Sequence, residues 1–270
     1  MSFYTSLNGM KNAQTSLGVI AHNISNSETY GFKRSRTEFS EIVAGSALTN
    51  PRMIQGIGSS VESITQNFSL GPVEQTGSAL DLAITGDGFF TTRSASDGST
   101  LYTRSGSFSM TESGNIADSA GNRLQVFAVD ANGQVTGNAI GDAQVPPVNA
   151  NGSEFAGVTV TATGIVQASY ADGTVDPVGA VALASFISPT GLKKVGSANW
   201  EGTGLSGAAT YGSPGTGAYG SLLSGALERS NVDIAEELVG LITAQRNFQA
   251  NAKAIDTATQ ISQTVINLRT

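Results

Sequence analysis

The chain has 270 residues, enough to bury a sizeable core as one large domain or two modest ones. Charged residues make up only 13% and the formal net charge is -7, which argues against a general nucleic-acid binder because phosphate contacts need clustered Lys and Arg. The absence of cysteine excludes disulfides, thiolate chemistry and Cys-based metal sites, whereas the 33 glycines suit short strands and many turns.

The first residues give no sign of a leader or an anchor. No basic segment precedes an apolar run there, so no ordinary secretory signal is predicted. No run of about 18 apolar residues predicts insertion into a membrane. These observations fit a cytoplasmic protein, and they equally fit one exported by a route that reads an uncleaved N-terminus.

Apolar residues recur in a heptad pattern at the start of the chain. Seven-residue steps join Phe3, Met10, Leu17 and Ile24, and Leu7, Gln14 and Ala21 lie between them. This 4-3 spacing predicts a helix over 1–28 with a coiled-coil seam. The helix runs into NISNSETYGFKRSR (23–36), a turn-rich, then aromatic, then basic segment that predicts a joint.

Strand and turn signals fill the centre of the chain. An apolar strand at Leu80–Ile84 runs into a tight Gly turn, and further strand candidates are 101–103, 107–110, 123–129, 158–163, 165–170 and 178–186. Turns are predicted at Asp97-Gly98, Asn132-Gly133, Asn151-Gly152 and Asp172-Gly173.

The last segment repeats the heptad pattern of the first. Ile234, Leu241, Phe248 and Ile255 recur at sevens, with Leu238, Gln245 and Ala252 between them, and the stripe then drifts to Ala258, Ile261, Val265 and Leu268. Asp233 followed by Glu236 has the spacing of a capping box, which predicts a helix start near residue 232.

Glycines and glutamines weaken both predicted helices. Gly9, Gly18 and Gly240 lie within them and each costs about 1 kcal/mol relative to Ala, while Gln14 and Gln245 lie in the seam itself. The ordinary alternative is a two-helix core. A two-stranded coiled coil weakened in this way is marginal, so we expect further copies of the chain to stabilise it.

The expected fold class is therefore α+β, with N- and C-terminal helices paired as a coiled coil and a central all-β domain. Residues 1–28 with 232–270 form the expected helical polymerisation domain, 29–75 an extended joint region, and 76–231 the β domain. No large additional outer domain is predicted.

The sequence offers little for catalysis. The single histidine, His22, lies within the first helix, so a hydrolytic triad or a multi-histidine metal site is not expected. Residues 215–220 (GTGAYG) match G-x-G-x-x-G formally, but Ser213-Pro214 precedes them in place of a buried strand. A calcium loop opening at Asp130 would need an acid where Gly141 stands. We predict no cofactor, no metal and no enzyme activity.

Several segments resemble one known family. Residues 22–33 (HNISNSETYGFK) are similar to the signature N-N-I-A-N-x-x-T-x-G-F-K of the axial proteins of the bacterial flagellum, with His22 for Asn and Ser25 for Ala. Four further segments resemble the same family: LDLAITGDGFF (80–90), YTRSGSF (102–108), SGALERSNVD (224–233) and AQRNFQANAK (244–253). The chain is thus identified as a member of the rod and hook family of axial proteins, and the resemblance covers nearly its whole length.

Within that family the hook members are the most similar. YGFK (30–33) with FSEIVAG (39–45) and the ending VINLR (265–269) resemble hook more than rod. The resemblance implies a structural subunit of the flagellar hook that polymerises helically into a torque-transmitting flexible joint. The distal rod protein is the alternative because 270 residues is close to rod length and many hook proteins carry an additional outer domain.

The family resemblance also implies sites, partners and a location. The expected polymerisation seam comprises Phe3, Leu7, Met10, Leu17, Ile20, Ile24, Ile234, Leu238, Leu241, Phe248, Ile255, Ile261 and Val265. The expected joint comprises Asn23, Asn26, Thr29, Tyr30, Gly31, Phe32 and Lys33, with Tyr30 and Phe32 anchoring it against neighbouring subunits. Expected partners are many copies of the chain, the distal rod protein, the hook cap and hook–filament junction proteins, and the type III export apparatus. The expected location is the hook and basal body outside the cell, reached without a cleaved signal peptide.

Two readings from other classes stay open at this point. A secreted enzyme would need convergent titratable groups, which the scattered acids of the sequence do not suggest. A soluble adaptor using a coiled coil would form a discrete oligomer in place of an open-ended tube.

Overall fold

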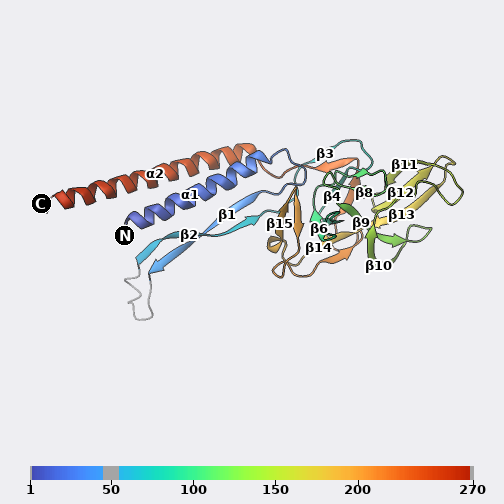
Figure 1. Cartoon of the computed structure of the whole chain (residues 1–270), viewed down its shortest axis with the longest axis horizontal. Coiled ribbons are helices and arrows are strands. Elements are labelled where there is room, and N and C mark those ends of the chain that lie inside the picture. The colour runs from blue at the N-terminus through green and yellow to red at the C-terminus, as the bar shows by residue number, and fades with distance from the viewer. Residues whose placement is uncertain (1, 45–54, 268–270) are drawn as a thin grey trace. The chain divides into compact units, whose positions relative to one another are not determined.

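The computed structural model describes residues 2–44 and 55–267 and divides the chain into two compact units. Unit 1 takes Met1–Ser27, Arg34–Asn67 and Val232–Thr270, and unit 2 takes Glu28–Lys33 and Phe68–Asn231. The chain therefore passes from one unit to the other four times. Figure 1 shows the elements of both units.

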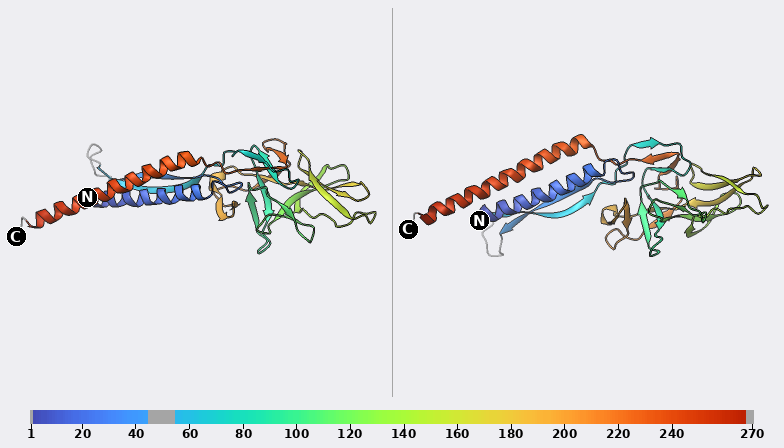
Figure 2. Two further views of the ribbon diagram at one scale, coloured as in Figure 1. Left: turned by 90° about the horizontal axis from the view of Figure 1, so that it is seen from above. Right: turned by 45° about the horizontal axis from the view of Figure 1, so that its top comes forward.

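Unit 1 consists of two helices and a two-stranded ribbon. Helix α1 (Ser2–Ser25) and helix α2 (Ile234–Asn267) lie side by side, and the antiparallel strands β1 (Ser35–Ala44) and β2 (Gln55–Gln66) run along α1 (Figure 2). The Nδ2 of Asn12 fixes α1 to β2 by donating to the Ser59 carbonyl oxygen at 2.9 Å. Both strands of this ribbon lie within the segment 29–75, which the sequence predicted only as an extended joint.

Polar side chains define the inner ends of both helices. The Asp233 carboxylate accepts hydrogen bonds from the amides of Ala235 (2.8 Å) and Glu236 (3.2 Å), which confirms it as the N-cap of α2. After α1 ends, the Nδ2 of Asn26 donates to the carbonyl oxygen of His22 at 2.9 Å. The predicted continuation of the last helix to Leu268 lies outside the described residues.

Unit 2 is built almost entirely of antiparallel strands. Its main sheet follows the order β11-β12-β13-β9-β5-β6-β16-β15, with β7, β8, β10, β14 and β17 off this path, and β18–β4 and β19–β3 form two separate pairs. The strands are β3 (Val73–Gln75), β4 (Leu82–Thr85), β5 (Phe89–Arg93), β6 (Thr100–Thr103), β7 (Ser109–Met110), β8 (Ile116–Ala117), β9 (Arg123–Val129), β10 (Val135–Asp142), β11 (Phe155–Val160), β12 (Ile165–Tyr170), β13 (Val175–Val181), β14 (Leu183–Ser185), β15 (Lys193–Gly196), β16 (Asn199–Glu201), β17 (Thr210–Gly212), β18 (Ser221–Ser224) and β19 (Ala226–Glu228), with a short 3-10 helix η2 (Pro189–Gly191).

The strand predictions are confirmed where the apolar pattern is strong. Strands β9 and β12 have the predicted bounds, and the glycines of the four predicted turns all have positive φ. The predicted strand 178–186 is two strands, because β13 pairs with β12 and β9 whereas β14 pairs with β5 and β17. Strand β10 was not predicted, and its side chains are largely exposed, so it carries no apolar run.

Two apolar clusters make up most of the core of unit 2. The larger contains Leu82, Phe90, Leu124 and Val166 among its buried members. The second is aromatic, and Trp200, the only tryptophan of the chain, is 1% exposed within it. None of the helices in the described parts of the chain has the length and apolar character needed to cross a membrane.

Candidate assembly surface and joint

The two helices of unit 1 meet through small residues. Ala13 and Ala244 are the buried apolar residues of this contact, at 7% and 5% exposed. A Cβ atom built on Gly9 would lie only 2.5 Å from the Oδ1 of Asn251, and one built on Gly240 would lie 3.5 Å from Ile20. Glycine at position 9 therefore lets α1 approach α2 closely. The sequence had indicated only that Gly9 weakens the helix.

The contact face has heptad spacing, but it is displaced from the predicted seam. Gly9, Ala13, Ile20 and Asn23 on α1 face Glu237, Gly240, Ala244 and Asn251 on α2. Ile20 is itself a predicted seam residue, and each of the other contact residues precedes a position of the predicted heptad pattern by one. One residue is about 100° around a helix, so apart from Ile20 the predicted apolar stripes lie beside the contact face.

The predicted seam side chains stay open to solvent in the single chain. Phe3, Ile234, Leu238 and Ile261 are exposed, at 42%, 43%, 47% and 59%. The remaining members are half-buried: Leu7, Met10, Leu17, Ile20, Ile24, Leu241, Phe248 and Ile255. The Val265 side chain lies outside the described residues. Among the seam side chains that are described, none is fully buried, so the helices retain apolar surface that another protein surface can cover.

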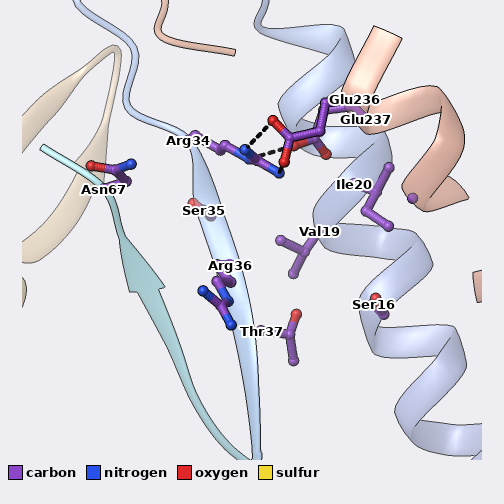
Figure 3. A pocket seen from close by; sticks show the side chains of 11 residues that line it. Ser16, Val19, Ile20, Arg34, Ser35, Arg36, Thr37, Asn67, Glu236 and Glu237 are labelled. Carbon is purple, nitrogen blue, oxygen red and sulfur yellow. Dashed lines mark hydrogen bonds and ion pairs between the residues drawn. The ribbon is translucent and has the colours of Figure 1, made fainter. Parts of the chain in front are cut away.

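Polar side chains tie the start of β1 to both helices, and we call this group the helix anchor. The Asn23 amide is 1% exposed; its Oδ1 accepts from the Ser35 amide at 2.9 Å and its Nδ2 donates to the Ser35 carbonyl oxygen at 2.8 Å. The Arg34 guanidinium binds both Glu236 oxygens, at 2.9 and 3.0 Å, and lies 2.6 Å from Glu237 (Figure 3). The hydrogen bonds to Glu236 raise the pKa of Arg34.

The acids of the helix anchor serve two purposes. Glu236 and Glu237 lie in the first turn of α2, where negative charge is favoured by the helix dipole. They also neutralise Arg34 next to a cleft of about 340 Å³, which Val19 and Thr37 help to line (Figure 3). These bonds fix the start of strand β1 against both helices of unit 1.

A second charged group is buried within unit 2. The Glu228 carboxylate accepts from the Lys33 ammonium at 2.5 Å, from the Arg104 guanidinium at 3.4 Å and from the Gly71 amide at 2.9 Å. The Lys33 ammonium also donates to the Ser69 carbonyl oxygen at 2.7 Å. Burial lowers the pKa of Lys33 and that of Arg104, and the Glu228 charge opposes this effect on both cations. We call Lys33, Arg104 and Glu228 the buried cluster.

The predicted joint residues are held within their own chain. Gly31 has φ +67°, its amide donates to the Glu228 carbonyl oxygen at 2.8 Å, and a Cβ on it would lie 2.3 Å from the Ser105 nitrogen, so only glycine fits. Phe32 is 3% exposed, with the Lys194 ammonium 4.5 Å from its ring centre. The anchoring of Phe32 against a neighbouring subunit, expected from the sequence, is therefore wrong, because its ring is covered by unit 2 itself.

The other joint residues differ in exposure. Tyr30 is 37% exposed, and the Thr29 carbonyl oxygen accepts from the Phe32 amide at 3.3 Å.

Lys33 and Arg34 are consecutive, yet their side chains belong to unit 2 and unit 1 respectively. The sequence prediction missed the acids that pair with these cations, Glu228 and Glu237, and it missed Arg104, a second cation bound to Glu228. Glu228 and Arg104 lie in segments that resemble the family, and this resemblance was the signal in the sequence that could have identified them.

The described residues contain no group of three or more His, Asp or Glu side chains arranged to hold a metal ion. The helix anchor and the buried cluster each join backbone segments far apart in sequence. The terminal helices carry apolar stripes that are only partly covered, and charged groups fix these helices and the β unit internally. These features define a structural subunit that associates with other protein surfaces.

Comparisons with known proteins agree with this class. Three family models match: "Flagella basal body rod protein" over residues 3–33, "Flagellar hook protein FlgE/F/G D1 domain" over 83–168 and "Flagellar basal body rod FlgEFG protein C-terminal" over 223–268. The chain is 36% identical to the flagellar basal-body rod protein FlgG of Bacillus subtilis, covering 99% of this chain and 98% of that one. It is 36% identical to FlgG of Caulobacter vibrioides, covering 98% of both. It is also 28% identical to the flagellar hook protein FlgE of Salmonella typhimurium, covering all of both chains.

The chain therefore belongs to the family of flagellar rod and hook proteins. These are structural proteins of the flagellum and not enzymes, and the chain is a self-assembling subunit of that structure.

Proposed function

We propose that the chain is the subunit of the flagellar hook, which polymerises into a helical tube and transmits motor torque while bending. The observation that carries polymerisation is the pair of apolar stripes on α1 and α2, whose described side chains are half-buried or exposed in the single chain. The hook assignment is supported by the hook-like segments at 30–33, 39–45 and 265–269 and by a match that spans the whole hook protein of Salmonella typhimurium. Residue 45 and residues 268–269 of those segments lie outside the described residues.

In this proposal the seam residues of many copies pack as a coiled-coil tube around an export channel. Unit 2 forms the outer layer, where its weakly charged, Gly-, Ser- and Thr-rich surface suits contacts that slide. The subunit leaves the cell through the type III apparatus. Its partners are other copies, the distal rod protein, the hook cap and the hook–filament junction proteins.

The distal rod is a second candidate, and specific observations favour it. The FlgG proteins of Bacillus subtilis and Caulobacter vibrioides are more identical to the chain, at 36%, than the hook protein of Salmonella typhimurium, at 28%. Their alignments also run to 280 residues, close to the length of this chain, whereas the hook alignment runs to 411. In that case the same seam packing would build a rigid shaft.

Electron microscopy of basal bodies from a strain lacking the gene separates the two candidates. A complete rod without a hook is the result expected for the hook subunit. A truncated rod would overturn the hook assignment and move the chain inward to the distal rod.

The seam itself is tested with Leu17→Asp and Leu241→Asp. Each places a charge in a half-buried apolar stripe, so polymerisation of the purified chain should be lost, as seen by electron microscopy. Gln249→Asp, at an exposed position of α2 outside the seam, is the matched control and should still polymerise. Trp200 fluorescence reports unit 2; loss of its native signal in the seam variants would contradict a role confined to assembly.

A further inference from the structure

Unit 2 carries two large aliphatic side chains that almost nothing covers. Ile187 is 90% exposed and Leu205 is 84% exposed. Their segments are bonded to each other, because the Ser188 amide donates to the Ser206 carbonyl oxygen at 3.3 Å. This backbone hydrogen bond brings the two segments together, and each of them presents a large aliphatic side chain to solvent. Exposed aliphatic groups gathered in one region mark an interaction surface more strongly than single ones do.

The neighbouring hairpin of β15 and β16 adds to this surface. Val195 on β15 is 53% exposed, and the Lys193 side chain is 68% exposed while its ammonium lies 3.1 Å from Glu201. The next residue on the strand, Lys194, points to the other face, where its ammonium lies 4.5 Å from the centre of the Phe32 ring. We call Ile187, Lys193, Val195 and Leu205 the knob.

A hollow of opposite character lies elsewhere on unit 2, and we call it the groove. It has a volume of about 450 Å³ and its apolar lining includes Met110, Pro146, Pro147, Val148 and Phe155. Met110 and Val148 are exposed, at 39% and 49%. The charged residues of its lining are two acids, Glu112 and Glu154.

The knob and the groove lie at opposite ends of the main sheet. Phe155 of the groove begins β11, the first strand of the sheet path, and Lys193 of the knob begins β15, the last (Figure 1). A single copy cannot join its own two sheet ends. Two different surfaces on one molecule that fit each other produce a head-to-tail contact, which repeats along an assembly.

We propose that the knob of one copy docks into the groove of the next copy of the same chain. Ile187 and Leu205 enter the apolar hollow, and the Lys193 ammonium faces the carboxylates of Glu112 and Glu154. The inference rests on the proposed polymer and deepens it by naming a contact between β units. Such a contact is small, so it is weak alone and gains strength when the helices already hold the copies together.

The natural absence of cysteine makes cross-linking a clean test. Two single variants, Leu205→Cys in the knob and Val148→Cys in the groove, are polymerised together and oxidised, and covalent dimers are counted on a non-reducing gel. We expect at least about tenfold more dimer than from Leu205→Cys mixed with Val135→Cys, since docked thiols have a far higher effective concentration. Val135 is the matched control because it is a valine of similar exposure, 40%, on β10.

The single variants sharpen the test. Because the contact joins unlike surfaces, Leu205→Cys alone and Val148→Cys alone should cross-link no better than the control mixture. Polymers seen by electron microscopy without the specific dimer would overturn the docking while leaving the proposed function intact. Failure of the unsubstituted chain to polymerise would instead overturn the proposed function, and the docking with it.

Discussion

The two units of the chain bury apolar surface very differently. Among the described residues of unit 1, only Ala13 and Ala244 are buried apolar residues, whereas unit 2 buries large side chains such as Phe90, Leu183 and Trp200. Burial of apolar area is the main favourable contribution to folding, at about 25 cal/mol per Å². Unit 2 therefore has the core of a domain that folds by itself, and unit 1 does not.

The difference between the two units indicates which of them would gain stability from assembly. Unit 1 keeps its large aliphatic side chains at the surface and fixes its elements with polar contacts such as those of Asn23 and Arg34. In the proposed polymer, further copies would cover those side chains and supply the burial that unit 1 lacks. The following variants test this contrast, starting with the largest expected effect.

Neutralising Glu228 should destabilise unit 2 strongly. Glu228→Gln leaves Lys33 and Arg104 buried without their counter-charge, and breaking a buried ion pair costs about 3–5 kcal/mol. The pKa of Lys33 should fall further, since the Glu228 charge that opposes its burial is gone. Urea unfolding followed by Trp200 fluorescence measures the loss.

An exposed acid provides the control for Glu228. Glu74 lies 3.7 Å from Arg229, and both side chains are partly open to solvent, at 48% and 39%. Glu74→Gln should cost less than about 1 kcal/mol. Equal losses in the free energy of unfolding in the two variants would show that burial does not make the ion pairs of the cluster more important for stability than an exposed pair.

The sequence indicated Lys33 as a joint residue but did not predict the buried cluster, and the reason is physical. Lys33 and Gly31 belong to a segment that resembles the family, but the 195 residues between Lys33 and Glu228 hide their pairing from any local pattern. The terminal helices and strands β9 and β12 were predictable because their apolar periodicity is local. Strand β10 and the β1–β2 ribbon were missed, since exposed, polar strands are held by pairing that leaves little trace in hydropathy.

The helix contact was misplaced for a related reason. Heptad analysis selects large apolar residues, such as Met10 and Leu241, whereas α1 and α2 meet through Gly9, Ala13 and Ala244 one residue away. Small residues permit close approach but carry no hydrophobic signal. The large residues are consistent with a different partner, in line with the proposed polymer.

Substitutions at two glycines of α1 distinguish the effect of close packing on stability from the effect of helix propensity. Gly9→Gln must displace the Asn251 side chain, so the helix pair should be about 1–3 kcal/mol less stable in this variant than in Gly18→Gln, which shares the gain in helix propensity. Gly18 has no atom within 4 Å of an added Cβ, so Gly18→Gln should stabilise α1 by up to about 1 kcal/mol. Urea unfolding followed by circular dichroism of the helices measures both, with Trp200 reporting that unit 2 is intact. Equal responses of the two variants would contradict a contact at Gly9.

The smallest effect is a pH dependence confined to unit 2. Tyr102 is 6% exposed and its hydroxyl lies 2.9 Å from that of Tyr211; burial, followed by this hydrogen bond, raises the pKa of Tyr102 above its usual value of 10.0. Above that pH the unfolded chain releases the Tyr102 proton while the folded chain keeps it, so stability falls as pH rises. The lowered pKa of Lys33 acts in the opposite direction, which is why the comparison with Tyr102→Phe, where Lys33 is unchanged, is needed. The stability advantage of the natural chain over Tyr102→Phe should shrink by about 1.4 kcal/mol between pH values of about 9 and 11, measured by Trp200 fluorescence in urea. A constant difference across that range would mean that Tyr102 titrates in the folded unit as it does in water, and that the aromatic cluster admits solvent.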